Sequence, residues 1–337
     1  MGKNKKKKKG KGLLVGSAAA AGAFTALNGF ILYEVMNKNG KLIGKIAQKQ
    51  DEEKAEAKIK AKEEAKENGA EIVETPRPRW TYETPCEEII INNRNLNLKG
   101  YYYPANEPSD TFAFCIHGYR STAKWEYAGI AQYYHNKGYN VFMMDHQGSG
   151  ESEGNNISFG YYEKIDCMKW LEYLLERFGN DIKIILHGIS MGSATAMLMS
   201  SDNELPENVK LTVADCGYTT VDAQFTNVLH SAHFPAYPII KMTNLLNKLV
   251  YKFEYSKVRP IDAVVDAKVP ILFVHGGNDT FIDPNMAYEL YNACTSPKDL
   301  LIIEGADHAE SFDVNPKLYS EKLDEFIGKY LEGTTVQ

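Results

Sequence analysis

Paired cysteines, metal-ligand spacings and phosphate-binding motifs are all missing from this sequence of 337 residues. Its five cysteines are scattered, odd in number and without C-x-x-C spacing, so we expect no disulfide framework and no zinc site. The glycine-rich stretch 145–154 lacks the G-x-x-x-x-G-K spacing of a phosphate cradle and contains acidic residues, so we interpret it as a structural loop. A net charge of −6 argues against nucleic acid as a partner. We therefore expect no metal, no cofactor and no nucleic acid.

Charge is also absent from one long stretch near the N-terminus. Seven lysines lie among the first eleven residues, and the 21 residues Leu13–Tyr33 that follow contain no charged side chain. As a helix this stretch would be about 31 Å long, which matches the roughly 30 Å hydrocarbon core of a bilayer. We predict a basic tail at 1–12 and a single transmembrane anchor at 13–36. A cleaved signal peptide, with Ala21-Gly22-Ala23 as its cleavage site, and a soluble tail are the alternatives.

The predicted anchor also has a preferred orientation. More lysines precede it than follow it closely, so the positive-inside rule favours a catalytic domain on the extracytoplasmic face, whereas the unpaired cysteines favour the opposite face. The segment 37–78 is predicted to be a charged stalk and linker, with a solvated helix over 51–68. The prolines in 75–79 end that helix and mark the start of the catalytic domain at 79–337.

From residue 80 onward, short apolar runs alternate with helical stretches. The expected strands are 87–92 and 96–102 as an antiparallel pair, then 111–116, 140–144, 182–186, 209–214, 271–274 and 300–303. The expected helices are 127–137, 161–178, 190–201, 284–294 and 315–331. This alternation predicts an α/β fold with a mostly parallel, doubly wound sheet, whose site lies at the carboxyl ends of the strands. The strand-free, aromatic-rich interval 219–258 predicts an inserted helical cap.

A nucleophile elbow is predicted at Gly188-Ile189-Ser190-Met191-Gly192. The motif fits G-x-S-x-G, in which a sharp strand-to-helix turn exposes the serine hydroxyl. Glycine is needed on both sides of the turn because a side chain there would collide with the neighbouring strand and helix. Ser190 is therefore the candidate nucleophile.

A serine nucleophile needs a base, and the base needs an orienting carboxylate. The elbow topology places the acid and then the histidine after the serine in the chain. Asp279 and His308 each follow a predicted apolar strand in that order, so we predict that Asp279 orients His308. Asp215 and Asp283 remain alternatives for the acid.

Catalysis by such a serine also requires backbone N–H groups that stabilise the developing oxyanion. We expect one from Met191, the residue after the nucleophile. The other is expected from Tyr119, in the loop after strand 111–116, where Gly118 permits close approach of the backbone.

Taken in order, His117-Gly118-Tyr119, the 145–154 loop, the elbow, Asp279 and His308 resemble the α/β-hydrolase superfamily. The similarity is greatest to its serine aminopeptidase-like and prolyl-oligopeptidase-like serine hydrolases, including membrane-anchored bacterial types. This resemblance implies the α/β-hydrolase fold, the roles of the triad and a cap between the sixth and seventh strands. His146-Gln147 departs from the pair that is usual in the family, which concerns the packing of the loop.

We therefore expect a serine hydrolase that works through an acyl-enzyme, and most simply a carboxylesterase for small or lipid-like acyl esters. A peptidase of the serine aminopeptidase type that cleaves short peptides is the alternative within enzymes. A catalytically silent hydrolase fold that serves as a binding module is the alternative outside them.

Overall fold

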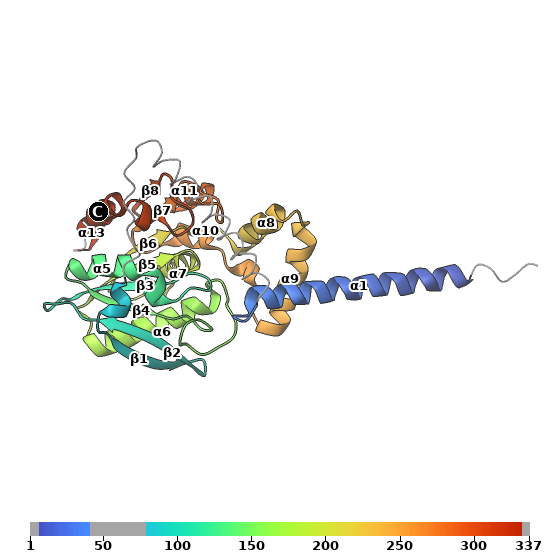
Figure 1. Cartoon of the computed structure of the whole chain (residues 1–337), viewed down its shortest axis with the longest axis horizontal. Helices are drawn as coiled ribbons and strands as arrows, with labels where there is room; N and C mark the ends of the chain where they lie inside the picture. Colours follow the sequence, from blue (N-terminus) through green and yellow to red (C-terminus); the bar gives the residue numbers. More distant parts are fainter. Residues whose placement is uncertain (1–6, 41–78, 332–337) are drawn as a thin grey trace, which may run out of the picture.

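The computed structural model describes residues 7–40 and 79–331 (Figure 1). For residues 7–21 only the backbone is described, as part of helix α1 (Lys7–Met36). Residues 1–6 of the predicted basic tail and the whole of the predicted stalk helix over 51–68 lie outside the described residues.

An eight-stranded sheet forms the centre of the catalytic domain, with the strand order β1-β2-β4-β3-β5-β6-β7-β8. Its first two strands are antiparallel to each other and to β4, and the remaining neighbours pair in parallel. The strands are β1 (Glu87–Asn93), β2 (Leu96–Tyr103), β3 (Thr111–Ile116), β4 (Asn140–Met144), β5 (Lys183–Ile189), β6 (Val209–Asp215), β7 (Ile271–Gly276) and β8 (Lys298–Ile303). The predicted α/β class and mostly parallel sheet are confirmed.

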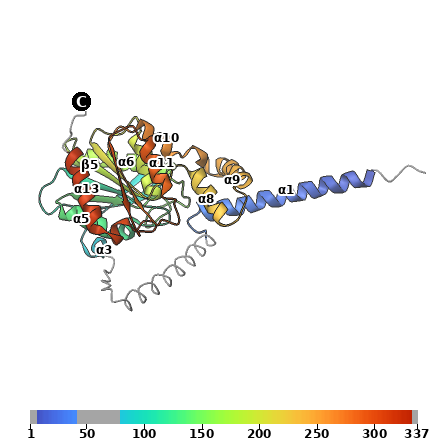
Figure 2. The ribbon, with the colours of Figure 1, turned by 90° about the horizontal axis from the view of Figure 1, so that it is seen from above.

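Both faces of the sheet are covered, which explains why the central strands are mostly apolar and buried along nearly their whole length. In β3 the side chains alternate: Phe112 and Phe114 belong to the core on one face, and Ala113 and Cys115 to the core on the other. The core around Ala113 and Cys115 is completed by helices α5 (Ala128–Asn136) and α13 (Pro316–Tyr330). The core around Phe112 and Phe114 is completed by α6 (Tyr161–Phe178) and α7 (Met191–Ser200) on the other face of the sheet (Figure 2). Trp170 of α6 is fully buried against Phe142.

The interval between β6 and β7 is helical, in line with the cap predicted there. It contains α8 (Val221–Ser231), α9 (Ala236–Tyr251) and the short 3₁₀ turn η1 (Tyr255–Lys257). The buried positions Ala236, Ile239, Thr243 and Asn247 recur every three or four residues, so α9 presents one face to the rest of the protein. The remaining helices are α3 (Trp80–Glu83), α4 (Ala123–Glu126), α10 (Pro260–Ala263), α11 (Asn285–Ala293) and α12 (Ser311–Val314), with the 3₁₀ turn η2 (Val264–Asp266).

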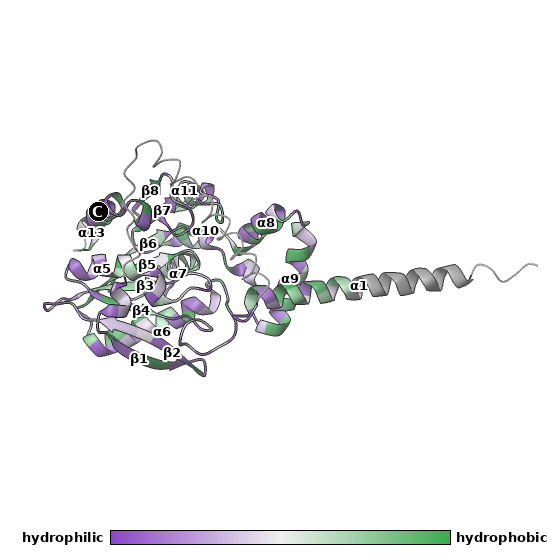
Figure 3. Ribbon diagram, in the orientation of Figure 1, coloured by the Kyte–Doolittle hydropathy of each residue, from purple (hydrophilic) through white to green (hydrophobic). Residues whose placement is uncertain are grey.

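The C-terminal end of α1 packs against the cap. Leu32 and Met36 are buried in an apolar cluster with residues of the cap, and Figure 3 shows hydrophobic residues on both helices where α1 meets α9. Asn28 and Glu34 are also buried, although they are polar.

This packing bears on the transmembrane anchor predicted at 13–36. None of the helices in the described ranges has the length and apolar character needed to cross a bilayer. In the last turns of α1, Leu32 and Met36 are covered by protein, whereas Leu27, Phe30 and Tyr33 are about half exposed.

Candidate active site

Ser190 lies at the turn between β5 and α7, at the carboxyl edge of the sheet. Its backbone has a positive φ in a sparsely populated region, with φ 57° and ψ −115°. Such a conformation costs about 1–3 kcal/mol and persists only when the surroundings enforce it. Here the Ser190 N–H donates to the carbonyl of Asp215 at 2.8 Å, which fixes the turn to the end of β6.

The two glycines of the elbow are required by close approach of the backbone. A Cβ on Gly188 would lie 2.2 Å from the carbonyl oxygen of Gly192, and a Cβ on Gly192 would lie 1.8 Å from that of Ile116. Both distances are far shorter than a van der Waals contact, so larger residues would force the helix away from the sheet. This is the steric reason that the sequence pattern predicted.

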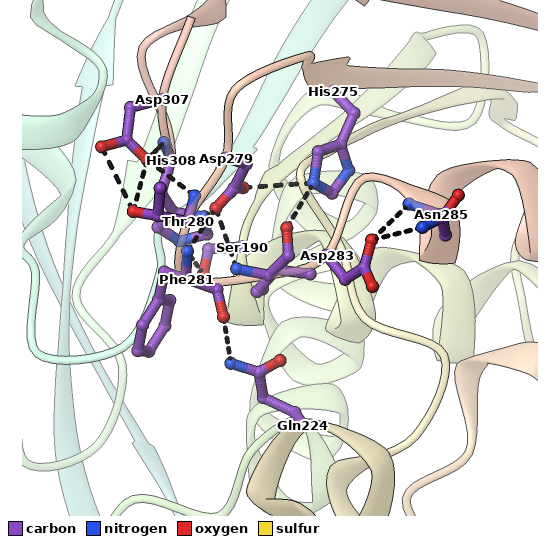
Figure 4. Close-up of polar contacts among 11 residues, drawn as sticks. Ser190, Gln224, His275, Asp279, Thr280, Phe281, Asp283, Asn285, Asp307 and His308 are labelled. Carbon is purple, nitrogen blue, oxygen red and sulfur yellow. Dashed lines mark hydrogen bonds and ion pairs between the residues drawn. The ribbon is translucent and has the colours of Figure 1, made fainter. Parts of the chain in front are cut away.

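The structure brings Ser190, His308 and Asp279 together from three separate loops (Figure 4). His308 follows β8, and its Nε2 lies 2.9 Å from Ser190 Oγ. Its Nδ1 lies 2.8 Å from Asp279 Oδ2, in the loop after β7. One imidazole therefore bridges the hydroxyl and the carboxylate, with about a fifth of its side chain exposed.

The Asp279 carboxylate is buried and fully engaged. Its Oδ1 accepts the backbone N–H groups of Phe281 and Ile282, both at 2.8 Å. Its Oδ2 faces His308 and also lies 3.1 Å from Nε2 of His275. Burial alone would raise the pKa of this carboxyl, but the hydrogen bonds from His275 and His308 outweigh it and hold the pKa well below its usual range. Asp279 is therefore ionised at neutral pH.

Among the hydrogen bonds of this site, neither Asp215 nor Asp283, the two alternative acids, pairs with a ring nitrogen of His308. Asp215 accepts the hydroxyl of Tyr319 at 2.8 Å, and burial raises its pKa to about 6. Asp283 accepts the backbone and side-chain nitrogens of Asn285 at the start of α11. The geometry thus favours Asp279 over both.

The loop that holds Tyr119 packs directly on the nucleophile. A Cβ on Gly118 would lie 3.1 Å from Ser190 Cβ, so the backbone passes close to the serine and a side chain there would crowd it. The Gly118 N–H donates to the Glu126 carboxylate through a short hydrogen bond, which orients the loop. Met191 is the first residue of α7, where helical N–H groups lack an intrahelical partner.

Two buried histidines connect this loop to the one after β4. The backbone N–H of His146 donates to His117 Nε2 at 2.9 Å, and His146 Nε2 lies 3.0 Å from the carbonyl oxygen of His117. Burial lowers the pKa of His117 to about 3 and that of His146 to about 4, so both rings are neutral at neutral pH. His146, where the sequence departs from the family pattern, thus stabilises the loop that holds Tyr119.

The 145–154 loop is organised by its own aspartate. The Asp145 carboxylate accepts the hydroxyl of Tyr101 and the backbone N–H groups of Ala123 and Glu151, at 2.9–3.0 Å. These bonds agree with its interpretation as a structural loop. Within residues 7–40 and 79–331, no group of three or more potential metal ligands is found.

Sequence reasoning missed three residues of this site: His275, Glu126 and Arg120. His275 was interpreted as structural, yet it contacts the carboxylate that faces His308. Its spacing of four residues from Asp279, across a glycine turn, was the available signal. No sequence signal indicated Glu126 or Arg120, because both side chains bind backbone atoms.

Comparison with known proteins agrees with this fold. A model of the serine aminopeptidase family S33 matches residues 107–266, a range that includes Ser190 but ends before Asp279 and His308. The uncharacterised protein YqkD of Bacillus subtilis is 28% identical over 250 residues, which cover 73% of this chain and 80% of YqkD.

Solved structures with the same fold include two from Pyrococcus. The esterase Pf2001 of Pyrococcus furiosus superposes with a TM-score of 0.60 at 20% identity, over 78% of this chain and 98% of the esterase. The acylaminoacyl peptidase of Pyrococcus horikoshii superposes with a TM-score of 0.56 at 16% identity, over 76% of this chain and 44% of the peptidase. The chain therefore has the α/β-hydrolase fold and is similar in sequence and structure to hydrolases of that superfamily.

Proposed function

We propose that this protein is a serine hydrolase that works through an acyl-enzyme, with Ser190 as nucleophile, His308 as base and Asp279 as orienting acid. The observation that carries the proposal is the hydrogen-bonded series Ser190 Oγ, His308 Nε2, His308 Nδ1 and Asp279 Oδ2, with separations of 2.9 and 2.8 Å. A serine hydroxyl is a poor nucleophile at neutral pH, and this geometry removes its proton as it attacks.

In the first half of the reaction, Ser190 Oγ bonds to the carbonyl carbon of the substrate while its proton passes to His308 Nε2. The tetrahedral intermediate collapses, the bond to the leaving group breaks, and His308 returns the proton to the departing oxygen or nitrogen. In the second half, water attacks the acyl-enzyme with His308 again as base, and Ser190 is released. Asp279, ionised and fixed by backbone N–H groups, holds the imidazole in the tautomer with the proton on Nδ1.

The tetrahedral intermediate carries negative charge on the former carbonyl oxygen. We propose that the backbone N–H groups of Met191 and Tyr119 bind this oxygen. The close passage of Gly118 against Ser190 supports this assignment. Loss of one such donor typically costs about 10²–10³ in turnover.

A carboxylic ester with a small or lipid-like acyl group is the substrate class we propose. This choice is supported by the apolar residues around the site. Met191 belongs to a buried cluster with Phe159, Tyr218 and Ile282. Phe225 of α8 packs on Phe159 with ring centroids 5.1 Å apart. Apolar packing of this kind next to Ser190 suits an acyl chain better than a charged peptide. A peptidase is the second candidate, because the matching family model is described as a serine aminopeptidase.

Hydrolysis of p-nitrophenyl esters of graded acyl length, compared with aminoacyl anilides, distinguishes the two candidates. The proposal predicts ester turnover that is abolished in Ser190→Ala and a preference for esters over anilides. Faster turnover of anilides would favour the peptidase. Absence of turnover with both classes would favour the silent binding module.

Attachment to a membrane through residues 1–36, with the catalytic domain on the extracytoplasmic face, is proposed from the sequence alone. Its support is the lysine block followed by the uncharged stretch Leu13–Tyr33. The full-length protein is expected to sediment with membranes, and a variant that lacks residues 2–21 is expected to remain in the supernatant. Recovery of both in the supernatant would contradict the attachment.

A further inference from the structure

The end of helix α1 lies against the loop that follows β3, although the two are far apart in the sequence. Arg120 extends across this junction. Its guanidinium donates to three backbone carbonyls of the N-terminal segment: those of Glu34 at 2.5 Å, Asn37 at 3.0 Å and Gly40 at 2.9 Å.

Tyr119 is bound to the same segment. Its hydroxyl donates to the carbonyl of Val35 at 2.7 Å, and its ring lies under the Arg120 guanidinium, 5.1 Å from the ring centroid. The ring also stacks on Phe159 with centroids 5.2 Å apart. Tyr119 and Arg120 are therefore both hydrogen-bonded to the last turn of α1 or to the turn that follows it.

These contacts fit the chemistry of a helix end. The last carbonyls of an α-helix lack intrahelical partners and carry partial negative charge, so a cation with several donors binds them well. Arg120 itself has a left-handed backbone, with φ 56°. For a residue with a side chain this costs about 1–2 kcal/mol, and it requires outside contacts to persist. The three carbonyls supply those contacts.

The N-terminal segment is in turn fixed to the catalytic domain. Ile157 donates its backbone N–H to the carbonyl of Met36 at 2.7 Å, and Lys38 donates to that of Asn155 at 3.0 Å. Met36 and Leu32 belong to the same apolar cluster as Met191. The segment is thus bound directly to Tyr119 and shares an apolar cluster with Met191, the two residues whose N–H groups face the oxyanion in the proposed function.

We infer that residues 32–40 position the oxyanion hole, with Arg120 as the positioning residue that connects them to Tyr119. This inference rests on the proposed function. The N-terminal segment therefore contributes to the geometry of the site, although it precedes the catalytic fold in the chain. Movement of α1 would change turnover by shifting the Tyr119 N–H relative to the substrate carbonyl.

Substitution of Arg120 in the full-length protein tests this inference with a p-nitrophenyl ester as substrate. Active-site concentration is determined by fluorophosphonate titration to completion, so that misfolded protein does not enter the rates. Arg120→Ala is expected to lower kcat about 10- to 100-fold, below the cost of losing a donor outright, with KM changed less than twofold. Arg120→Lys, which keeps the charge but loses the fork of donors, should recover part of the rate.

Gly40→Ala is the second variant, because it disturbs the junction while leaving Arg120 in place. Its Cβ would lie 2.2 Å from the Glu34 carbonyl oxygen and 2.6 Å from an Arg120 nitrogen. The same loss of kcat is expected from it. Arg177→Ala is the matched control, because Arg177 pairs with Glu87 of the edge strand β1 and is not part of residues 32–40, and it should retain wild-type turnover.

A boronic acid inhibitor separates positioning from general destabilisation, because its adduct with Ser190 is tetrahedral and places an oxygen in the oxyanion hole. Its affinity should fall by the same factor as kcat in both variants. Wild-type kcat and boronate affinity in Arg120→Ala and Gly40→Ala would overturn the inference. An inactive wild-type protein would instead overturn the proposed function on which it rests.

Discussion

His275 Nε2 lies 3.1 Å from Asp279 Oδ2, the same oxygen that faces His308 Nδ1 at 2.8 Å. The His275 side chain is almost fully buried, and its Nε2 also lies 3.1 Å from the carbonyl oxygen of Ile282. Two imidazoles therefore share one carboxylate oxygen, and His275 fixes the position of the acid relative to the base.

Removal of that contact is expected to weaken the triad without destroying it. In His275→Phe, Asp279 loses one hydrogen bond to a charged group, worth about 1.5 kcal/mol, which corresponds to about tenfold in kcat. The measurement is kcat and KM on a p-nitrophenyl ester, with His135→Gln as control because His135 binds the distant carbonyl of Pro104. Unchanged kcat in His275→Phe would show that His275 is only a core residue.

Replacement of the acid is expected to be far more costly. Asp279→Asn keeps an oxygen acceptor for the backbone N–H groups but no longer stabilises the imidazolium and favours the wrong tautomer. By the precedent of serine triads, kcat should fall by about 10⁴. Asp283→Asn is the matched control, since Asp283 binds Asn285 and not His308. A comparable loss in Asp215→Asn with normal turnover in Asp279→Asn would move the acid to Asp215.

Stability at acid pH is expected to depend on His187, a fully buried residue of β5 between the hydroxyls of Tyr134 and Tyr319. Burial lowers the pKa of His187 to about 3. Between that value and the unfolded pKa of about 6.5, the unfolded chain holds a proton on this ring and the folded chain does not. The free energy of unfolding therefore falls as pH falls through this window, by about 1.4 kcal/mol per pH unit for this one group.

Comparison with His187→Gln isolates that contribution, because glutamine keeps a donor and an acceptor but does not titrate. Urea denaturation at pH 7, 6, 5 and 4 should show wild type losing stability relative to the variant at each step below 6.5. Parallel pH profiles for the two proteins would mean that His187 is not the group responsible.

The order of strands and helices followed from the sequence because a sheet covered on both faces requires fully apolar strands. The runs at 111–116, 140–144 and 161–178 even matched β3, β4 and α6 in their bounds. The triad candidates were also accessible to sequence reasoning, since each follows an apolar strand and parallel strands end at one edge of the sheet.

The contacts around the site were not accessible in the same way. Arg120 binds carbonyl oxygens up to 86 positions away, and backbone acceptors leave no mark on the sequence. The last turns of α1 are mostly apolar, and the sequence alone does not tell whether lipid or the cap covers them. In the structure, Leu32 and Met36 pack on protein.

Labelling with a fluorophosphonate probe tests the central claim most directly, because the probe reacts only with a serine that is activated as a nucleophile. One labelled site is expected in the wild-type protein, found at Ser190 by peptide mass spectrometry, and no labelling is expected in Ser190→Ala. A folded wild-type protein that resists labelling, or labelling that persists in Ser190→Ala, would contradict the account.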